Sequence, residues 1–304
     1  MQKFKFDWSE SKKKMSEPPA NTGFKKDERI YSPEFSKQGT VNVLMRFLPP
    51  MRDAQGKLCD ADFPFVGPVY YHNISEHKKW LNVICPTSIG LSCPVCECNK
   101  ENWDDYNSLQ RKRSRKINYY SNVLILKDHL HPENEGKVFI FRYGKKIYEK
   151  MMEKANPSAE SLVSQADYWD YYQGTNFKLI IKKIKLESDS VAQNNYDSSC
   201  FEDSLSPIAK TDEEIEAIMN KCYPLKPFIA ESAFEPYETL VKKFAKFTST
   251  SSSSSSSGVG SSKAQNKAPA EDAPVADDDI TPDAGEVASA DDADDIFAKI
   301  KDED

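Results

Sequence analysis

The chain has 304 residues, of which 38% are apolar, so it is long enough to bury a sizeable hydrophobic core. Its 41 lysine and arginine residues face 48 aspartate and glutamate residues, which gives a net charge of −7. No apolar run approaches the roughly 20 residues of a membrane-spanning helix, so a soluble protein without a membrane partner is expected. The seven cysteines are an odd number, and the N-terminus has no secretory signal, which argues against a disulfide framework.

The charge is divided unevenly along the chain. Residues 248–304 contain 14 acidic and 4 basic residues, a net charge of −10. Residues 1–247 contain the remaining 34 acidic and 37 basic residues, a net charge of +3. This division predicts a mildly basic body joined to a separate acidic tail.

Residues 1–24 are polar and are expected to form a flexible basic arm. The lysines of this arm are Lys3, Lys5, Lys12, Lys13 and Lys14. The Ser16–Asn21 segment contains two adjacent prolines and separates the arm from the body. The body is therefore expected to span residues 25–247.

Within the body, period-two alternation and β-branched or aromatic runs predict strands, and helical spacing predicts helices. The predicted strands are 41–47, 120–126, 138–143 and 177–185. The predicted helices are 145–154, 211–222 and 236–247, the second of them opened by a capping box at Thr211–Glu214. The fold class expected from these elements is α+β and β-rich.

Residues 248–304 begin with a serine tract that includes Ser251–Ser257, which is typical of a flexible linker. The alanine, proline and aspartate residues beyond it predict a disordered acidic tail. Near its end, Asp294, Asp295, Ile296 and Phe297 place apolar side chains behind acids, a pattern that suits a short ligand for a partner protein. The alternative is a tail that serves solubility alone.

One histidine and three cysteines are spaced as a metal-binding set. Twelve residues separate His72 from Cys85, seven separate Cys85 from Cys93, and two separate Cys93 from Cys96. An imidazole and three thiolates complete a tetrahedral shell, which is how structural zinc is held in proteins. The sequence therefore predicts one zinc ion bound by these four residues.

Other assignments of these residues stay open at this stage. His77 offers an alternative to His72, and Cys98 offers an alternative to Cys96. The thiols could also be a redox pair or unrelated buried cysteines, although no βαβ pattern surrounds them. Four protein ligands leave no open position for water, so the zinc is predicted to be structural and not catalytic.

A basic segment rich in aromatic residues lies beyond the cysteines. The cations available to contact phosphates are Arg111, Lys112, Arg113, Arg115, Lys116, Arg142, Lys145 and Lys146. The rings on which unstacked bases could lie include Tyr106, Tyr119, Tyr120, Phe141, Tyr143 and Tyr148. Cations along a groove with flat aromatic faces are typical of single-stranded nucleic-acid binding. The opposing interpretation places the rings in the core and the cations on a solvated surface.

The sequence predicts binding and no catalysis. It contains no phosphate-binding P-loop, no dinucleotide-binding glycine fingerprint and no HExxH metalloprotease motif. A zinc-containing nucleic-acid enzyme and a duplex-binding regulator remain the alternatives. No helix near the cysteines is recognisable as a reader of the major groove, which counts against the regulator.

An ordered series of segments resembles the single-stranded DNA-binding, or helix-destabilising, proteins of T-even-type bacteriophages. The resemblance covers residues 22–247 and runs through Val43–Pro49, Lys79–Trp80, the histidine and cysteine set, Ser108–Leu109, Arg111–Arg113, Pro132–Phe139, Arg142, Gly144–Ile147, Asn176–Phe177 and Asn195–Asp197. It implies an oligonucleotide/oligosaccharide-binding (OB) fold core with a zinc-binding subdomain at about residues 60–130. DNA is expected in the cleft between them.

The resemblance also implies roles for particular residues. Zinc ligands would be His72, Cys85, Cys93 and Cys96, and DNA contacts would be Arg46, Trp80, Tyr106, Arg111, Lys112, Arg113, Tyr119, Tyr120, Phe141, Tyr143 and Tyr196. The N-terminal arm would bind a neighbouring copy and give cooperative, sequence-nonspecific binding. The acidic tail would recruit replication, recombination and repair proteins in the cytoplasm of the infected bacterium. The chain departs from the family in having seven residues between Cys85 and Cys93, where nine are common.

Overall fold

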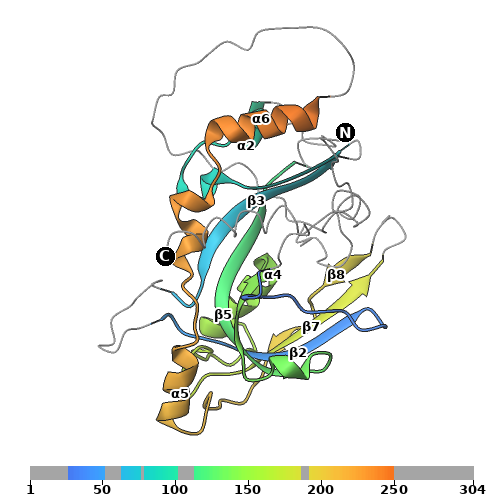
Figure 1. Ribbon diagram of the computed structural model, residues 1–304. Coiled ribbons are helices and arrows are strands. Elements are labelled where there is room, and N and C mark those ends of the chain that lie inside the picture. The colour runs from blue at the N-terminus through green and yellow to red at the C-terminus, as the bar shows by residue number, and fades with distance from the viewer. Residues whose placement is uncertain (1–26, 52–62, 77–78, 102–112, 186–191, 250–304) are drawn as a thin grey trace, which may run out of the picture.

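A computed structural model describes residues 27–51, 63–76, 79–101, 113–185 and 192–249, which form a mixed nine-stranded β-sheet with helices packed around it (Figure 1). The strands are β1 (Ile30–Tyr31), β2 (Thr40–Phe47), β3 (Val66–Glu76), β4 (Lys79–Ile84), β5 (Lys116–Asp128), β6 (Val138–Tyr143), β7 (Phe177–Ile184), β8 (Gln193–Asn195) and β9 (Cys200–Phe201). The α-helices are α2 (Pro94–Glu101), α4 (Lys145–Ala155), α5 (Asp212–Met219) and α6 (Tyr237–Thr248). Short 3₁₀ helices are η1 (Pro86–Ile89), η2 (Pro132–Asn134), η3 (Lys226–Ile229) and η4 (Glu231–Ala233).

β5 joins the two halves of the molecule. Its first residues, Lys116–Tyr120, pair with β3, and its last residues, Val123–Asp128, pair with β2 along the same edge. The opposite edge pairs with β6. In Figure 1, the antiparallel strands β3 and β5 extend between the half that contains β2 and β7 and the half that contains α2 and α6. One continuous strand therefore ties both halves together.

The hydrophobic core of the lower half, which contains β2 and β7, arises from the alternation of apolar residues along β2. Val41, Val43, Met45 and Phe47 are buried on one face of this strand, as the sequence pattern predicts. Their neighbours across the sheet, including Leu179 on β7, belong to the same hydrophobic cluster. Burial of these apolar side chains from both strands is the main force that fixes the register of the pairing.

The structure confirms the α+β, sheet-rich class. Strands appear where they were predicted at 41–47, 120–126, 138–143 and 177–185, and helices α4, α5 and α6 occupy the three predicted positions. The Oγ1 atom of Thr211 accepts a hydrogen bond from the Glu214 backbone N–H at 3.3 Å, so the predicted N-cap of α5 is present. β3, β4 and α2 were not predicted.

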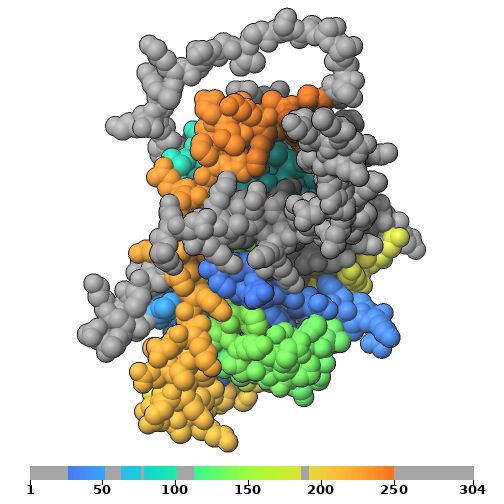
Figure 2. Space-filling model, in the orientation of Figure 1, coloured from blue at the N-terminus to red at the C-terminus, as the bar shows by residue number. Residues whose placement is uncertain are grey.

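A C-terminal segment connects the two halves along the outside of the sheet. The side chain of Asn122 in β5 exchanges two 2.9 Å hydrogen bonds with the backbone of Tyr223, as a neighbouring strand would. Further along, the ring of Phe228 stacks on Tyr120 with centroids 4.3 Å apart. The chain passes from α5 through these contacts to α6, which lies across the top of the molecule (Figures 1 and 2). Within the described ranges, no helix is long and apolar enough to cross a membrane.

Candidate functional site

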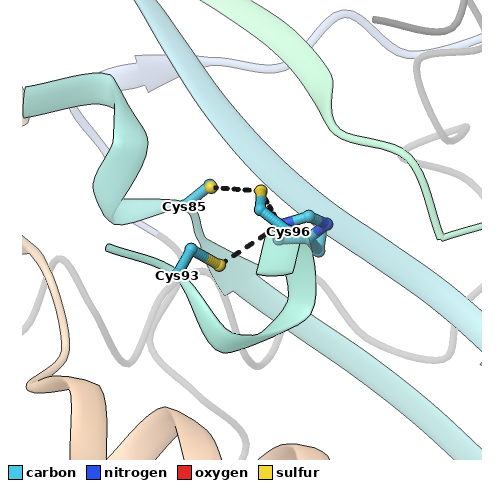
Figure 3. A group of neighbouring side chains, drawn as sticks. Cys85, Cys93 and Cys96 are labelled. Carbon is cyan, nitrogen blue, oxygen red and sulfur yellow. Dashed lines mark hydrogen bonds between the residues drawn. The ribbon is translucent and has the colours of Figure 1, made fainter. Parts of the chain in front are cut away.

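His72, Cys85, Cys93 and Cys96 come together in the upper half of the molecule. Their ligand atoms all lie within 4.8 Å of one another. Cys85 Sγ lies 3.4 Å from Cys96 Sγ, and His72 Nε2 lies 3.5 Å from Cys93 Sγ and 3.4 Å from Cys96 Sγ. Figure 3 shows the three cysteine side chains pointing toward one another. The structure thus brings together the four residues that the sequence spacing selected.

Three neighbouring elements position the four ligands. His72 lies on β3, Cys85 comes directly after the last residue of β4, and Cys93 and Cys96 lie at the start of α2, with Cys93 immediately before its first residue. The register of the β3–β4 pair, in which His72 faces Val83, brings the imidazole close to Cys85. Hydrophobic side chains of β3, β4, α2 and α6 surround the cluster and bury Cys85 and Cys93.

A second set of hydrogen bonds orients the ligands. Nδ1 of His72 lies 3.0 Å from the carbonyl oxygen of Arg113, which makes Nδ1 the protonated nitrogen and leaves Nε2 to face the thiols. The same carbonyl accepts a 3.0 Å bond from the side chain of Asn99 in α2. On the other side, the Thr87 hydroxyl lies 3.1 Å from Cys85 Sγ and accepts a 2.9 Å bond from Arg115 Nη1.

The four groups lie close enough to shift one another's pKa. Burial lowers the pKa of His72, but hydrogen bonds with the thiols of Cys85 and Cys93 outweigh burial and raise that pKa to about 10. Hydrogen bonds from Cys93 and Cys96 lower the pKa of Cys85, and the same close contacts raise the pKa of Cys96. Like charges this close oppose each other, so a cation between the sulfurs would favour the thiolate form of all three.

This donor set fits a divalent metal ion. Zinc bound tetrahedrally at about 2.3 Å from sulfur and 2.0–2.1 Å from nitrogen would separate its ligand atoms by about 3.6–3.8 Å. The observed separations of 3.4–3.5 Å are close to these values. Of the sequence alternatives, Cys98 lies on α2 outside this cluster, whereas His77 falls outside the described residues. The four residues can therefore hold one metal ion.

Two arginines of the predicted basic run, Arg113 and Arg115, make contacts within the half of the molecule that contains the cluster. Arg113 is buried and makes two 2.7 Å hydrogen bonds to the Glu76 carboxylate, and its guanidinium lies 5.5 Å from the ring centroid of Phe244. Arg115 is also buried, with its guanidinium 4.1 Å from the ring centroid of Tyr70. The other predicted contacts in this part of the sequence, Arg111, Lys112 and the aromatic Tyr106, lie outside the described residues.

Most of the predicted base-stacking rings in the described structure lie in the interior. Tyr119, Phe141 and Tyr143 belong to the main core cluster, and Tyr120 belongs to the cluster beneath η3. Burial raises the pKa of both Tyr119 and Tyr143 well above the ordinary value of tyrosine. The Tyr143 hydroxyl lies 2.9 Å from the hydroxyl of Ser121. All four rings were predicted as DNA contacts. In this arrangement Tyr143 packs against Tyr119 and Phe141, whereas Tyr120 stacks on Phe228.

Arg46 also lies in the interior, at 1% exposure. Its guanidinium donates to the side-chain oxygen of Asn176 at 2.9 Å, to the carbonyl of Asp170 at 3.3 Å and to Ser206 at 2.8–2.9 Å. Burial lowers its pKa to about 10. A Cβ at Gly174 would collide with Nη1, so glycine at that position makes room for the guanidinium. Arg46 thereby joins β2 to the loops at its end.

Two predicted contacts do reach solvent. Trp80 on β4 is 49% exposed, and Tyr196 is half-buried beside the main core. The structure adds an exposed ring that the sequence prediction omitted, Phe63, which stacks on Phe65 just before β3. The sequence does contain a signal for this pair of rings, since Phe63 and Phe65 are separated by one proline. Alternate residues of an extended chain share a face, so the two rings can stack.

The sheet-rich fold and the buried Cys₃His cluster define an α+β protein with a candidate metal centre. The chain belongs to the family described as "gp32 DNA binding protein like", whose model matches residues 39–248. It is 29% identical over 272 residues to the single-stranded DNA-binding protein of Enterobacteria phage T4, covering 87% of this chain and 85% of that protein. It is also 29% identical over 259 residues to the protein of the same name from Enterobacteria phage T2, covering 83% of this chain and 80% of that protein. These matches confirm the resemblance seen in the sequence.

Proposed function

We propose that this protein binds single-stranded DNA cooperatively and without sequence preference, and that it is not an enzyme. The observation that carries this proposal is the family match, which spans β2 through α6 and includes all four residues of the metal cluster. Relatives that cover most of the chain are named single-stranded DNA-binding proteins. The occurrence of these relatives in bacteriophages supports a role in DNA replication, recombination and repair within an infected bacterium.

We infer that the metal is zinc and that its role is structural. Three thiolates and one imidazole are the ligands that zinc prefers, and together they occupy a full tetrahedral shell. Bound zinc would supply four strong bonds that hold β3, β4 and α2 in place. With three thiolates the loaded centre carries one net negative charge, which the Arg115 guanidinium behind Thr87 would offset.

The proposed binding surface combines cations with aromatic faces. We infer that the strands around the main core form an OB fold and that the metal-binding half forms the second wall of a DNA cleft. Phosphate contacts release counterions, and stacking on rings tolerates any base, so this combination gives affinity without sequence preference. Among the predicted stacking rings, Trp80 on β4 is exposed and therefore accessible to a base, and Tyr106, Arg111 and Lys112 fall outside the described residues.

The two ends of the chain complete the proposal. The lysines of residues 1–24 would contact a neighbouring copy on DNA, which would give cooperative binding. Residues 248–304, with a net charge of −10, would bind partner proteins of DNA metabolism through a segment around Asp294–Phe297. Both segments lie outside the described structure except for Thr248 and Ser249.

Titration with poly(dT) and with matched duplex DNA tests the function. Intrinsic tryptophan and tyrosine fluorescence should be quenched by the single strand, with steep salt dependence and little response to duplex. Equal affinity for duplex would reject the proposal and favour a duplex-binding regulator. Divalent-metal-dependent turnover of labelled DNA would instead favour a nucleic-acid enzyme.

A further inference from the structure

Four aromatic rings, here named the aromatic series, form a continuous line of contacts that ends at the protein surface. The rings of Phe63 and Phe65, just before β3, are stacked with centroids 5.9 Å apart and planes 25° apart. Phe65 contacts Tyr148 of α4 edge to face at 5.4 Å, and Tyr148 lies parallel to Tyr119 of β5 at 4.0 Å. Each ring of the aromatic series thus touches the next.

The aromatic series passes from the core to solvent. Tyr119 is buried, Phe65 and Tyr148 are half-buried against the main core cluster, and Phe63 is 64% exposed. A single exposed apolar side chain is ordinary on a protein surface. Phe63 differs because an ordered stack of rings supports it from behind. Its solvent-facing side therefore offers a second flat ring a place to stack.

The inner end of the aromatic series is fixed by a close backbone contact. Gly67 has a φ of +143°, a conformation that other residues rarely adopt, and a Cβ there would lie 2.7 Å from Cδ1 of Tyr119. β3 therefore runs directly against the Tyr119 ring, and Tyr119 in turn supports Tyr148. A platform that is already ordered loses little conformational entropy when a ligand binds.

Cations lie on the helix that contributes Tyr148. Lys145 precedes Tyr148 by three residues, so both lie on one face of α4, and Lys146 is the neighbour of Lys145. Both lysine side chains are 43% exposed, and their ion pairs with Glu149 and Asp197 are long, at 3.9 and 4.0 Å. Exposed ion pairs of this length are weak in water, so a phosphate can compete with the Glu149 and Asp197 carboxylates for these lysines.

We propose that the exposed face of Phe63 stacks one base of single-stranded DNA while Lys145 and Lys146 contact adjoining phosphates. This proposal rests on the function proposed above and identifies a contact outside the predicted set. The site combines a flat apolar face with positive charge, which fits a nucleotide better than an uncharged apolar partner. Because a paired base in a duplex already has both faces stacked, Phe63 would favour single strands.

Two substitutions separate an aromatic role from an apolar one. Phe63→Leu keeps an apolar side chain but removes the ring, whereas Phe63→Tyr keeps the ring. We expect Phe63→Leu to weaken binding of a short dT oligonucleotide about 5- to 20-fold at fixed salt, and Phe63→Tyr to stay within about twofold. The slope of log Kd against log salt should be the wild-type slope for both, since neither variant removes a cation.

Tyr172→Leu is the matched control, because Tyr172 is another exposed ring, at 56%, outside the aromatic series. It should leave the affinity within about twofold of wild type, and melting temperatures should confirm that all variants fold. Equal affinity of wild type and Phe63→Leu would overturn the proposal. The proposal would also be overturned if Phe63→Leu bound poly(dT) more weakly than wild type but bound the short oligonucleotide equally well. That pattern would indicate that Phe63 contacts a neighbouring copy of the protein on the DNA. If the wild-type protein binds no dT, the proposed function itself fails.

Discussion

Arg113 joins three parts of the metal-binding half through one side chain and one carbonyl group. Its guanidinium is paired with Glu76 of β3 and lies over Phe244 of α6. Its carbonyl oxygen accepts the hydrogen bond from His72 Nδ1. A residue in this position controls the orientation of a metal ligand even though it does not touch the metal.

Replacing Arg113 should therefore affect the metal more than the DNA. We expect Arg113→Gln to lower zinc affinity by about tenfold or more, because it leaves the buried Glu76 carboxylate unpaired and loosens the backbone that orients His72. Competition with a chromophoric chelator measures this affinity. The salt slope of DNA binding should stay at the wild-type value, whereas the loss of a phosphate contact would reduce it by about one.

The double variant Arg113→Met with Glu76→Leu is the control for the buried charge. Replacing both partners with apolar side chains should recover much of the stability, since neither charge is then left unpaired. If this variant binds zinc normally but shows a reduced salt slope, Arg113 is a phosphate contact and its structural role is secondary.

His131, just beyond β5, provides a pH-dependent contact in the other half of the molecule. Its Nδ1 and Nε2 atoms lie 2.9 Å from Glu133 and 3.1 Å from Glu34, and these hydrogen bonds raise its pKa above the ordinary value of 6.5. The protonated form is favoured by folding, so its contribution to stability is complete below about pH 6.5 and is lost as pH rises through the folded-state pKa.

His131→Gln should remove this pH dependence. With zinc kept saturating, the melting temperature of wild type should exceed that of the variant by a larger margin at about pH 5.5 than at about pH 8.5. Glu34→Gln, which removes one of the two carboxylates, should lower the pKa of His131 in an NMR titration. A His131 pKa at or below about 6.5 in the wild-type protein would contradict the contact.

At the scale of elements, sequence patterns identified those whose signals are local. β2, β6 and β7 alternate or form apolar runs, and α5 begins with a capping threonine, so short-range rules sufficed. β3 contains Gly67 and Pro68, which ordinarily indicate a turn, and α2 has few apolar residues. Both are held by long-range contacts with the metal cluster and α6, which no local rule contains.

α6 illustrates such long-range dependence. Leu240 and Phe247 of this helix share a hydrophobic cluster with Cys85 and Cys93, and Tyr237 bonds to Glu97 of α2. Figure 2 shows α6 lying over the segment that contributes β4 and α2. A metal that fixes α2 and β4 also fixes the surface on which α6 packs. We therefore expect metal binding and docking of α6 to be linked equilibria.

Removing the metal should release α6 while leaving the lower half folded. In hydrogen exchange with mass spectrometry, we expect the amides of 237–249 to exchange at least about tenfold faster after chelation. α4 is the internal control, since its buried side chains Ile147 and Met151 pack in the other core and its exchange should change little. Equal protection of α6 with and without metal would show that the helix docks independently.

The same linkage predicts an effect in the reverse direction. Leu240→Ala, at a buried position, should destabilise the protein by about 2–5 kcal/mol and lower zinc affinity. Val241→Ala is a matched control on the same helix, because Val241 lies on the exposed side. Both variants having equal zinc affinity would contradict the coupling.

At the scale of the whole molecule, the spacing of the sequence predicted which four side chains gather in the candidate metal cluster, whereas the DNA contacts stay predictions. Ligand spacing constrains four residues to one point, and the structure brings His72 and the three cysteines together. An aromatic residue on a strand, by contrast, has the same sequence signal whether its ring faces core or solvent. Buried Tyr119 on β5 and exposed Trp80 on β4 illustrate the two outcomes, and tertiary packing decides between them.

The uneven charge of the chain supports a final prediction. Deleting residues 263–304 removes 14 acidic and 4 basic residues and leaves a body with a net charge of +3. If the acidic tail competes with phosphates, the deletion should strengthen single-stranded DNA binding about tenfold near roughly 50 mM salt, with the difference fading as screening increases. A full-length variant with its tail acids changed to Asn and Gln should behave like the deletion, which separates charge from length. Unchanged affinity and duplex melting in both variants would show that the tail does not compete for DNA.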